Sequence, residues 1–276
     1  MKDLSNWLLD TVKLYAERVR QELAARWKAF PLDLTRREIH EVIGALLARQ
    51  CALAIGIADN PPAWTPNLAG TLLRAMADLH ITLAWILLKP EDRTRQFVLH
   101  GLGQEKLLLE HLKSRGIDDK MTRSMEAWID SQRYTWLTEV NVGNWAELSI
   151  REMAEEAKLL DFYRLRYSPL SVEAHSMWNH IARFNLRTCE NPLHRYHRIP
   201  EIRSFSPNYG VLDSAGEMLA MTFALVDERL GLNIELESAF VLLDRRLEEY
   251  AGERGAQPST ADDGKADPGS ADDVVE

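Results

Sequence analysis

Hydrophobic positions recur every three or four residues along most of the chain, and no segment shows the two-residue alternation of a half-buried strand. This pattern predicts a single all-α domain, a bundle of about eight helices. Proline and charged residues mark several helix ends, as at Pro31 and Pro90. The main expected helices cover residues 5–30, 34–58, 67–89, 91–114, 120–133, 149–160, 169–186, 209–230 and 233–250.

The helix expected at 67–89 is apolar around most of its circumference, which is typical of the central helix of a bundle. The helix expected at 149–160 begins with Ser149 and has Glu152 three residues later. This spacing predicts a capping box, in which each side chain accepts a hydrogen bond from a free backbone amide. A loop is expected at Asn141–Val142–Gly143–Asn144.

The composition changes near the C-terminus, where Gly, Pro, Ser, Asp and Ala replace nearly all large apolar residues. We therefore divide the chain into a bundle domain at residues 1–251 and a disordered acidic tail at residues 252–276. The tail holds seven acids against two basic residues, so of the formal net charge of −9 only about −4 belongs to the bundle. The charge distribution therefore does not predict a basic surface that covers the whole molecule.

Cys51 and Cys189 are the only cysteines, which is typical of a reducing compartment. The N-terminal segment carries charges throughout and does not resemble a secretory signal, and the longest apolar-rich stretch, residues 79–88, is too short to span a bilayer. We expect a cytoplasmic protein that does not bind a membrane. Most of the eight tryptophans occupy apolar helical positions and are expected in the core.

Two polar stripes interrupt this apolar pattern. Tyr167, Ser171 and His175 stand four residues apart, and Arg74 and Asp78 have the same spacing among leucines and alanines. If both helices face one core, these side chains form a buried polar cluster. The cluster would fix the register of the helices, bind a ligand through Arg74, Asp78, Tyr167 and Ser171, or use His175 as a general acid or base.

The segments that carry these stripes, NWAELSIREMAEEAKLLDFYRLRYSPLSVEAHS and LLRAMADLHITLAWIL, resemble the bacterial all-helical family DUF5677, over roughly residues 40–185. The shared features are an Arg-x-x-x-acid helix, a Met-Ala-Glu-Glu helix start and a Tyr-x-x-x-Ser-x-x-x-His helix. Asp78 stands where the family more often has Glu. The resemblance implies an all-helical fold and transfers no activity, because the family is one of unknown function.

A second resemblance concerns metal-independent ribonucleases built on HEPN bundles, which pair an Arg and a His four to six residues apart across a dimer. Arg74 with His80, and Arg187 with His194, are the two candidate pairs, and the second lies where a long helix is expected to end. Thr188 departs from the usual residue after the Arg, and Pro192 makes the local backbone atypical. This resemblance implies a toxin or defence ribonuclease.

Metal and cofactor chemistry has no support in the sequence motifs. We find no His-Glu-x-x-His, no paired Glu-x-x-His, no glycine-rich phosphate loop and no Cys-x-x-Cys. The expectation is therefore no metal and no cofactor. The function expected first is a non-enzymatic binding or regulatory module, with the HEPN-like ribonuclease as the alternative, and the partners considered are a second copy of the chain, another protein or RNA.

Overall fold

The computed structural model describes residues 4–136, 146 and 148–255, and these residues are predominantly helical, as predicted. The helices of the first part are α1 (Leu4–Ala29), η1 (Leu34–Arg36), α2 (Arg37–Ala58), η2 (Pro61–Ala63), α3 (Ala69–Ile86), α4 (Pro90–Ser114) and α5 (Lys120–Trp136). The second part holds α6 (Ile150–Glu156), α7 (Leu160–Phe162), the π-helical turn η3 (Tyr163–Tyr167), α8 (Ser168–Ala174), α9 (Trp178–Phe184), β1 (Leu186–Thr188), β2 (Arg198–Pro200), α10 (Gly210–Leu230) and α11 (Ala239–Gly255).

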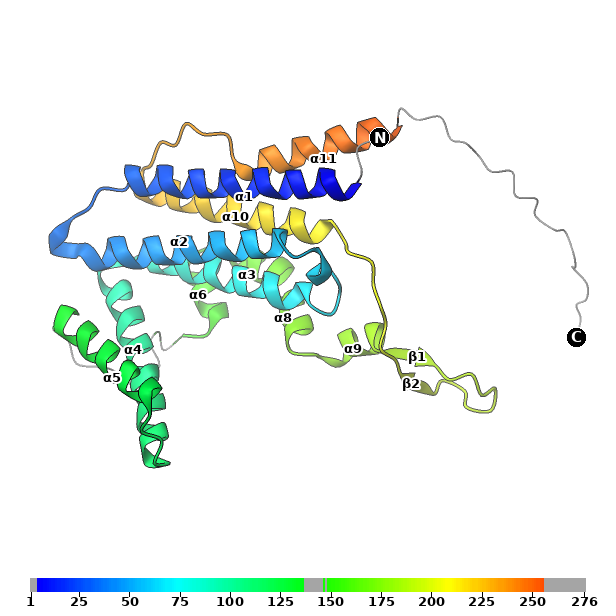
Figure 1. Cartoon of the computed structure of the whole chain (residues 1–276), viewed down its shortest axis with the longest axis horizontal. Helices are drawn as coiled ribbons and strands as arrows, with labels where there is room; N and C mark the ends of the chain where they lie inside the picture. The colour runs from blue at the N-terminus through cyan, green and yellow to red at the C-terminus, as the bar shows by residue number, and fades with distance from the viewer. Residues whose placement is uncertain (1–3, 137–145, 147, 256–276) are drawn as a thin grey trace, which may run out of the picture.

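The long helices α1, α2, α3, α10 and α11 form the body of the bundle (Figure 1). Helix α10 packs against α2, α3 and α11, while α1 packs against α2 and α11. Helices α6 and α8 cover the outer side of α3, and α4 and α5 form a helical pair that extends from one end. Chain segments far apart in sequence therefore meet along α3 and α10.

The core lies between these helices and contains the large side chains that the helical periodicity places inward. Fully buried members include Tyr15, Ile43, Met76, Leu83 and Phe223. Helix α8 approaches α3 closely at Gly70, where a Cβ atom would lie only 2.5 Å from Cβ of Glu173. A side chain at that position would push the two helices apart.

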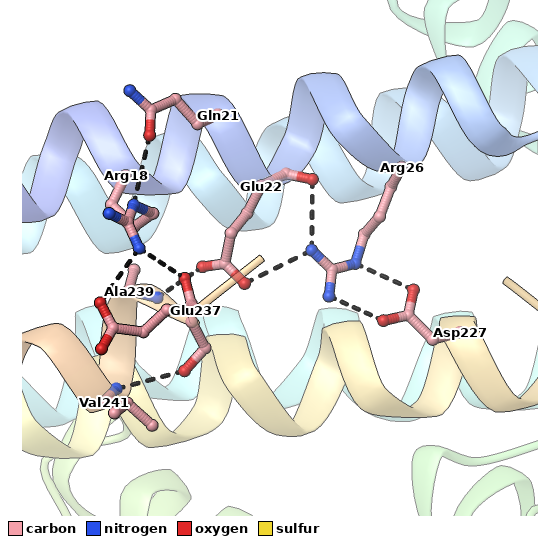
Figure 2. A network of polar contacts seen from close by, with 9 residues as sticks. Arg18, Gln21, Glu22, Arg26, Asp227, Glu237, Ala239 and Val241 are labelled. Atoms are coloured by element: carbon pink, nitrogen blue, oxygen red, sulfur yellow. Dashed lines mark hydrogen bonds and ion pairs between the residues drawn. The ribbon is translucent and has the colours of Figure 1, made fainter. Parts of the chain in front are cut away.

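A buried ionic network joins α1 to α10 and α11 (Figure 2). The Arg26 guanidinium donates two hydrogen bonds to the Asp227 carboxylate, at 2.9 and 2.7 Å, and one of 3.4 Å to Glu22. Glu22 also accepts a 2.7 Å hydrogen bond from the amide of Ala239, at the start of α11. Burial raises the pKa of Glu22, while the Ala239 amide and Arg26 oppose this shift. The network thus ties three helices together through Arg26 and the carboxyl groups of Glu22 and Asp227.

Residues Leu34–Ala58 form one helical segment that is long and apolar enough to cross a membrane by length and composition. Half of its most apolar window is buried in the bundle, where α2 packs against α1, α3 and α10. A core helix of a bundle passes the same test, so this segment is weak support for a membrane span. The cytoplasmic location stays a prediction.

Most helix ends lie within a few residues of those predicted. The capping box is present: Ser149 Oγ accepts from the Glu152 amide at 3.3 Å, and the Glu152 carboxylate accepts from the Ser149 amide at 2.7 Å. Helix α11 continues through residues 252–255, which the sequence pattern assigned to the tail. The predicted loop at 141–144 and residues 256–276 lie outside the described residues, and the division into domain and tail stays a prediction.

The helix predicted at residues 169–186 is broken into α8 and α9. Ser176 adopts a left-handed conformation with φ of 51°, the Ser176 amide donates to the Glu173 carbonyl, and the Met177 amide donates to the Val172 carbonyl. These two bonds form a Schellman motif, which ends a helix. Glycine usually fills this position, so the sequence did not signal the break.

A short antiparallel hairpin follows α9, although the sequence showed no strand alternation. β1 pairs with β2 so that Leu186 faces Pro200 and Thr188 faces Arg198. Strands of three residues are too short to show a period of two. We call residues 176–203 the arm, because α9 and the hairpin project from the bundle (Figure 1).

Candidate functional site

The two polar stripes meet between α3 and the segment formed by η3 and α8, as the spacing suggested. Arg74 Nε donates a 2.7 Å hydrogen bond to Ser171 Oγ, and its two Nη atoms donate to Asp78 and to the hydroxyl of Tyr167. The guanidinium carbon also lies 3.8 Å from the centroid of the Tyr167 ring. Arg74 therefore satisfies most of its donors within one cluster.

This cluster lies at the edge of the core rather than within it. Tyr167 is buried, but 43% of the Asp78 side chain is exposed. Burial raises the pKa of Tyr167 to about 12, and the charge of Asp78 adds to this shift while Arg74 opposes it. The phenol is consequently neutral at physiological pH and cannot act as a base.

His175 does not join the cluster. It caps the C-terminus of α8, where the chain turns away in the Schellman motif, and its side chain is exposed. The predicted stripe of Tyr167, Ser171 and His175 therefore ends at Ser171. The structure brings together four of the five residues of the two stripes and leaves the imidazole outside.

Arg187 and His194 lie on the hairpin instead of at a fraying helix end. Arg187, in β1, donates a 2.6 Å hydrogen bond to Glu190 and lies 3.8 Å from Glu201. The His194 ring instead contacts Cys189, Asn191 and His197. Each partner of the candidate pair is thus engaged with other side chains.

His80, the partner of the other candidate pair, is buried in the core on the side of α3 that faces α10. The Thr222 hydroxyl donates to the Met218 carbonyl at 2.8 Å, so its oxygen accepts from Gln50 at 2.9 Å and from His80 Nδ1 at 3.0 Å. This places the imidazole proton on Nδ1. Burial lowers the pKa of His80 to about 4, and the ring is therefore neutral at physiological pH.

A cavity of about 370 Å³ lies between α8 and α9, at the base of the arm. Its wall includes the cationic side chains Arg164 and Arg183, together with Asn179, Glu173 and the buried His180. Burial raises the pKa of Glu173, whereas the charge of His180 opposes this shift. The wall can accept an anionic group more readily than a cation.

The arm also exposes two large aromatic side chains, of which Trp178 was expected in the core. Trp178, at the start of α9, is 68% exposed, and Tyr196, in the hairpin turn, is 85% exposed. Trp7, Trp64 and Trp85 are buried, as predicted, but Trp27 and Trp128 are 45% and 49% exposed. The core prediction is therefore wrong for three of the six tryptophans whose burial the structure describes. One feature of the sequence could have indicated that this segment is exposed. Residues 176–203 carry five arginines and only two acids, in a chain of net charge −9.

One more cluster was missed. Cys189, His194 and His197 place their ligating atoms within 4.8 Å of one another in the hairpin. The spacing Cys-x4-His-x2-His is present in the sequence but matches none of the common metal-binding motifs.

Comparison with known proteins identifies a family and no activity. A model described as "Family of unknown function (DUF5677)" matches residues 40–192, which is more than half of the chain. The chain belongs to this family. A search of curated proteins and a search of solved structures found no match.

The DUF5677 segment begins in α2 and ends in the turn of the hairpin. It contains the whole Arg74 cluster and the cavity at the base of the arm, whereas His194 and His197 follow it. The Arg74 cluster is therefore a feature of the DUF5677 part of the chain, and the tip of the hairpin extends beyond that part.

Proposed function

We propose that this DUF5677 protein is a non-enzymatic binding module that holds single-stranded RNA on its arm. The observation that carries the proposal is a set of uncompensated cations beside exposed aromatic rings. Arg183, Arg195 and Arg198 are exposed, and no carboxylate among the described residues forms an ion pair with them. Trp178 and Tyr196 lie in the same segment.

The charge of the arm favours a polyanion. Residues 176–203 have a formal net charge of +3, while the whole chain has −9. Phosphates would be attracted to this segment and repelled by the rest of the acidic chain, which restricts binding to one region. Arg183 also lines the cavity between α8 and α9, where a phosphate could contact two guanidinium groups.

Exposed aromatic rings add a platform for bases. A base stacked on an aromatic side chain contributes about 1–3 kcal/mol, and every base can stack because each has a π face. Trp178 directly precedes Asn179 and His180 of the cavity wall. A strand of RNA could therefore place a phosphate in the cavity and stack an adjacent base on Trp178.

The arrangement of the candidate pairs supports binding rather than cleavage. A ribonuclease of the HEPN type needs an Arg and a His that reach one phosphate. Arg74 contacts α8 whereas His80 is buried toward α10, and Arg187 is paired with Glu190. The Arg74 cluster then serves to fix α8 on α3, which positions the base of the arm.

The test is fluorescence anisotropy with a labelled, unstructured RNA of about 16 nucleotides. We expect binding at low salt that weakens steeply as salt rises, and a loss of at least about tenfold in Arg183→Ala/Arg195→Ala. The variant Arg20→Ala/Arg49→Ala removes the same charge from exposed positions on α1 and α2 and is the matched control. It should bind nearly as well as the wild type.

RNA integrity is followed in the same samples on denaturing gels. The proposal expects intact RNA in every sample. Absence of binding at low salt, or an equal loss in the control variant, would contradict it. Cleavage that disappears in His194→Ala, with folding retained, would instead establish the ribonuclease alternative.

A further inference from the structure

Three side chains at the end of the hairpin have the chemistry of a transition-metal site. The ligating atoms of Cys189, His194 and His197 all lie within 4.8 Å of one another. We propose that this cluster binds one Zn²⁺ ion through the Cys189 thiolate and the two imidazoles. Metal binding here does not depend on the RNA-binding function.

The backbone of the hairpin brings these ligands together. Thr188 faces Arg198 in the strand register, and the next pair continues it, because the Cys189 amide donates a 2.9 Å hydrogen bond to the His197 carbonyl. The His197 amide donates in turn to the His194 carbonyl at 3.0 Å. The turn is therefore ordered by backbone hydrogen bonds, which lowers the entropy cost of binding.

The distance between two of the ligands fits a shared zinc ion. Cys189 Sγ lies 3.6 Å from His194 Nδ1. With Zn–S near 2.3 Å, Zn–N near 2.0–2.1 Å and a tetrahedral angle, the sulfur and nitrogen would be about 3.6 Å apart. The two atoms are thus already spaced as tetrahedral ligands.

The ligand types select the metal. Thiolate and imidazole are the ligands that zinc prefers, whereas Mg²⁺ and Ca²⁺ prefer carboxylate, carbonyl and water oxygens. Three protein ligands leave a fourth position, which water would fill. Cys189 is partly exposed and both histidines are exposed, so the ion can enter directly from solvent.

The same residues could be interpreted as a nucleophilic Cys–His pair, but the hydrogen bonds favour the metal site. Asn191 Oδ1 already accepts from the Leu193 amide, so its Nδ2 is the group that lies 3.3 Å from His194 Nε2. Without metal the ring proton then lies on Nδ1, which faces the sulfur and cannot accept the thiol proton.

Zinc binding would reverse this arrangement. Nδ1 would bind the ion and Nε2 would carry the proton. A rotation of the Asn191 amide would then turn its oxygen toward the ring, which is the outer contact that metal-bound imidazoles commonly make. The Leu193 amide that loses its partner is exposed and can bind water.

The ion would also stiffen the part of the hairpin between the two histidines. Arg195 and Tyr196 lie between His194 and His197, and Tyr196 has a left-handed backbone with φ of 65°. If the arm binds RNA as proposed above, zinc would hold these two side chains in a fixed turn. This consequence rests on the proposed function, whereas zinc binding itself does not.

Titration of the tag-free, reduced full-length protein with Co²⁺ and then Zn²⁺ tests the proposal. We expect one equivalent of Co²⁺ with a thiolate-to-cobalt charge-transfer band, which one equivalent of Zn²⁺ abolishes. Cys189→Ser and His194→Ala should weaken binding at least about 100-fold, since even outer contacts of metal ligands are worth 10–100-fold. Cys51→Ala and His175→Ala are the matched controls and should bind like the wild type.

Alkylation provides a second readout that does not depend on a spectrum. Cys51 is buried, so native protein should offer one reactive thiol, Cys189, and Zn²⁺ should protect it. Circular dichroism checks that each variant keeps its helices, which the exposed position of the hairpin favours. Absence of the charge-transfer band in the wild type, or equal affinity in Cys189→Ser, would overturn the zinc site and leave the RNA proposal untouched.

Discussion

Acidification should destabilise the bundle through His80, and the size of the effect follows from its burial. His80 is 2% exposed, and burial lowers the pKa of its imidazole from 6.5 to about 4. Thr222 accepts the Nδ1 proton of the neutral ring. A second proton would create a charge in the core with no carboxylate among the hydrogen-bond partners that the structure gives His80.

The sign follows from proton linkage. The unfolded chain binds a proton at His80 near pH 6.5, whereas the folded chain does so only near pH 4. The stabilisation is therefore complete above pH 6.5, declines as pH falls from 6.5 toward the folded value near 4, and is fully lost below it. With these two pKa values, the free energy of unfolding decreases by about 2 kcal/mol at pH 5 and by about 3 kcal/mol at pH 4, relative to neutral pH.

Urea denaturation followed by tryptophan fluorescence measures this effect between pH 7 and pH 4. The glutamine in His80→Gln can still donate a hydrogen bond to Thr222 but does not titrate. Between pH 7 and pH 4 the unfolding free energy of this variant should therefore fall by about 3 kcal/mol less than that of the wild type. His175→Gln, at an exposed position, should retain the wild-type slope. Equal slopes in wild type and His80→Gln would refute the reasoning.

Two further substitutions test the polar networks by urea denaturation. Arg26→Met should cost about 3–5 kcal/mol because it leaves the buried Glu22 carboxyl without its cation. Adding Glu22→Gln should restore much of the loss, and a double variant no more stable than the single one would contradict this. Arg74→Met should cost about 2–3 kcal/mol because the buried Tyr167 hydroxyl loses its donor, whereas Ser171→Ala should cost only about 1 kcal/mol. Equal losses from both changes would exclude this role for Arg74.

The helical fold and most helix ends were predictable because they depend on local signals. The periodicity of α1, α3 and α10 and the capping box at Ser149 are properties of neighbouring residues. The break at Ser176 was not predictable in this way, since a non-glycine residue adopts the left-handed conformation there. The break at Ser176 places His175 and His180 on different helical segments, so His175 does not reach the Arg74 cluster.

In the candidate site, too, the contacts that depend on local spacing were predicted and those that depend on tertiary packing were not. Arg74, Asp78, Tyr167 and Ser171 were predicted to meet because their spacing places them on single faces of α3 and of the η3–α8 segment. The exposure of the arm could not be predicted, because periodicity does not show whether another helix covers a given face. Trp178 occupies an apolar helical position yet remains exposed, since nothing among the described residues packs over α9 there.

The cluster of Cys189, His194 and His197 was not predicted from the sequence, for a related reason. Cys189 and His197 are eight residues apart and meet only because the chain reverses between them. The helical periodicity predicts that this stretch follows the end of a helix. A strand pair of three residues leaves too weak a pattern to correct that interpretation.

Ultraviolet crosslinking of the full-length protein to RNA, followed by mass spectrometry of the crosslinked peptides, shows directly whether the arm holds RNA without cutting it. We expect intact RNA attached to peptides within residues 176–203, with Trp178 or Tyr196 as the attachment site. Crosslinks confined to the helices of the bundle, or none at low salt, would contradict it.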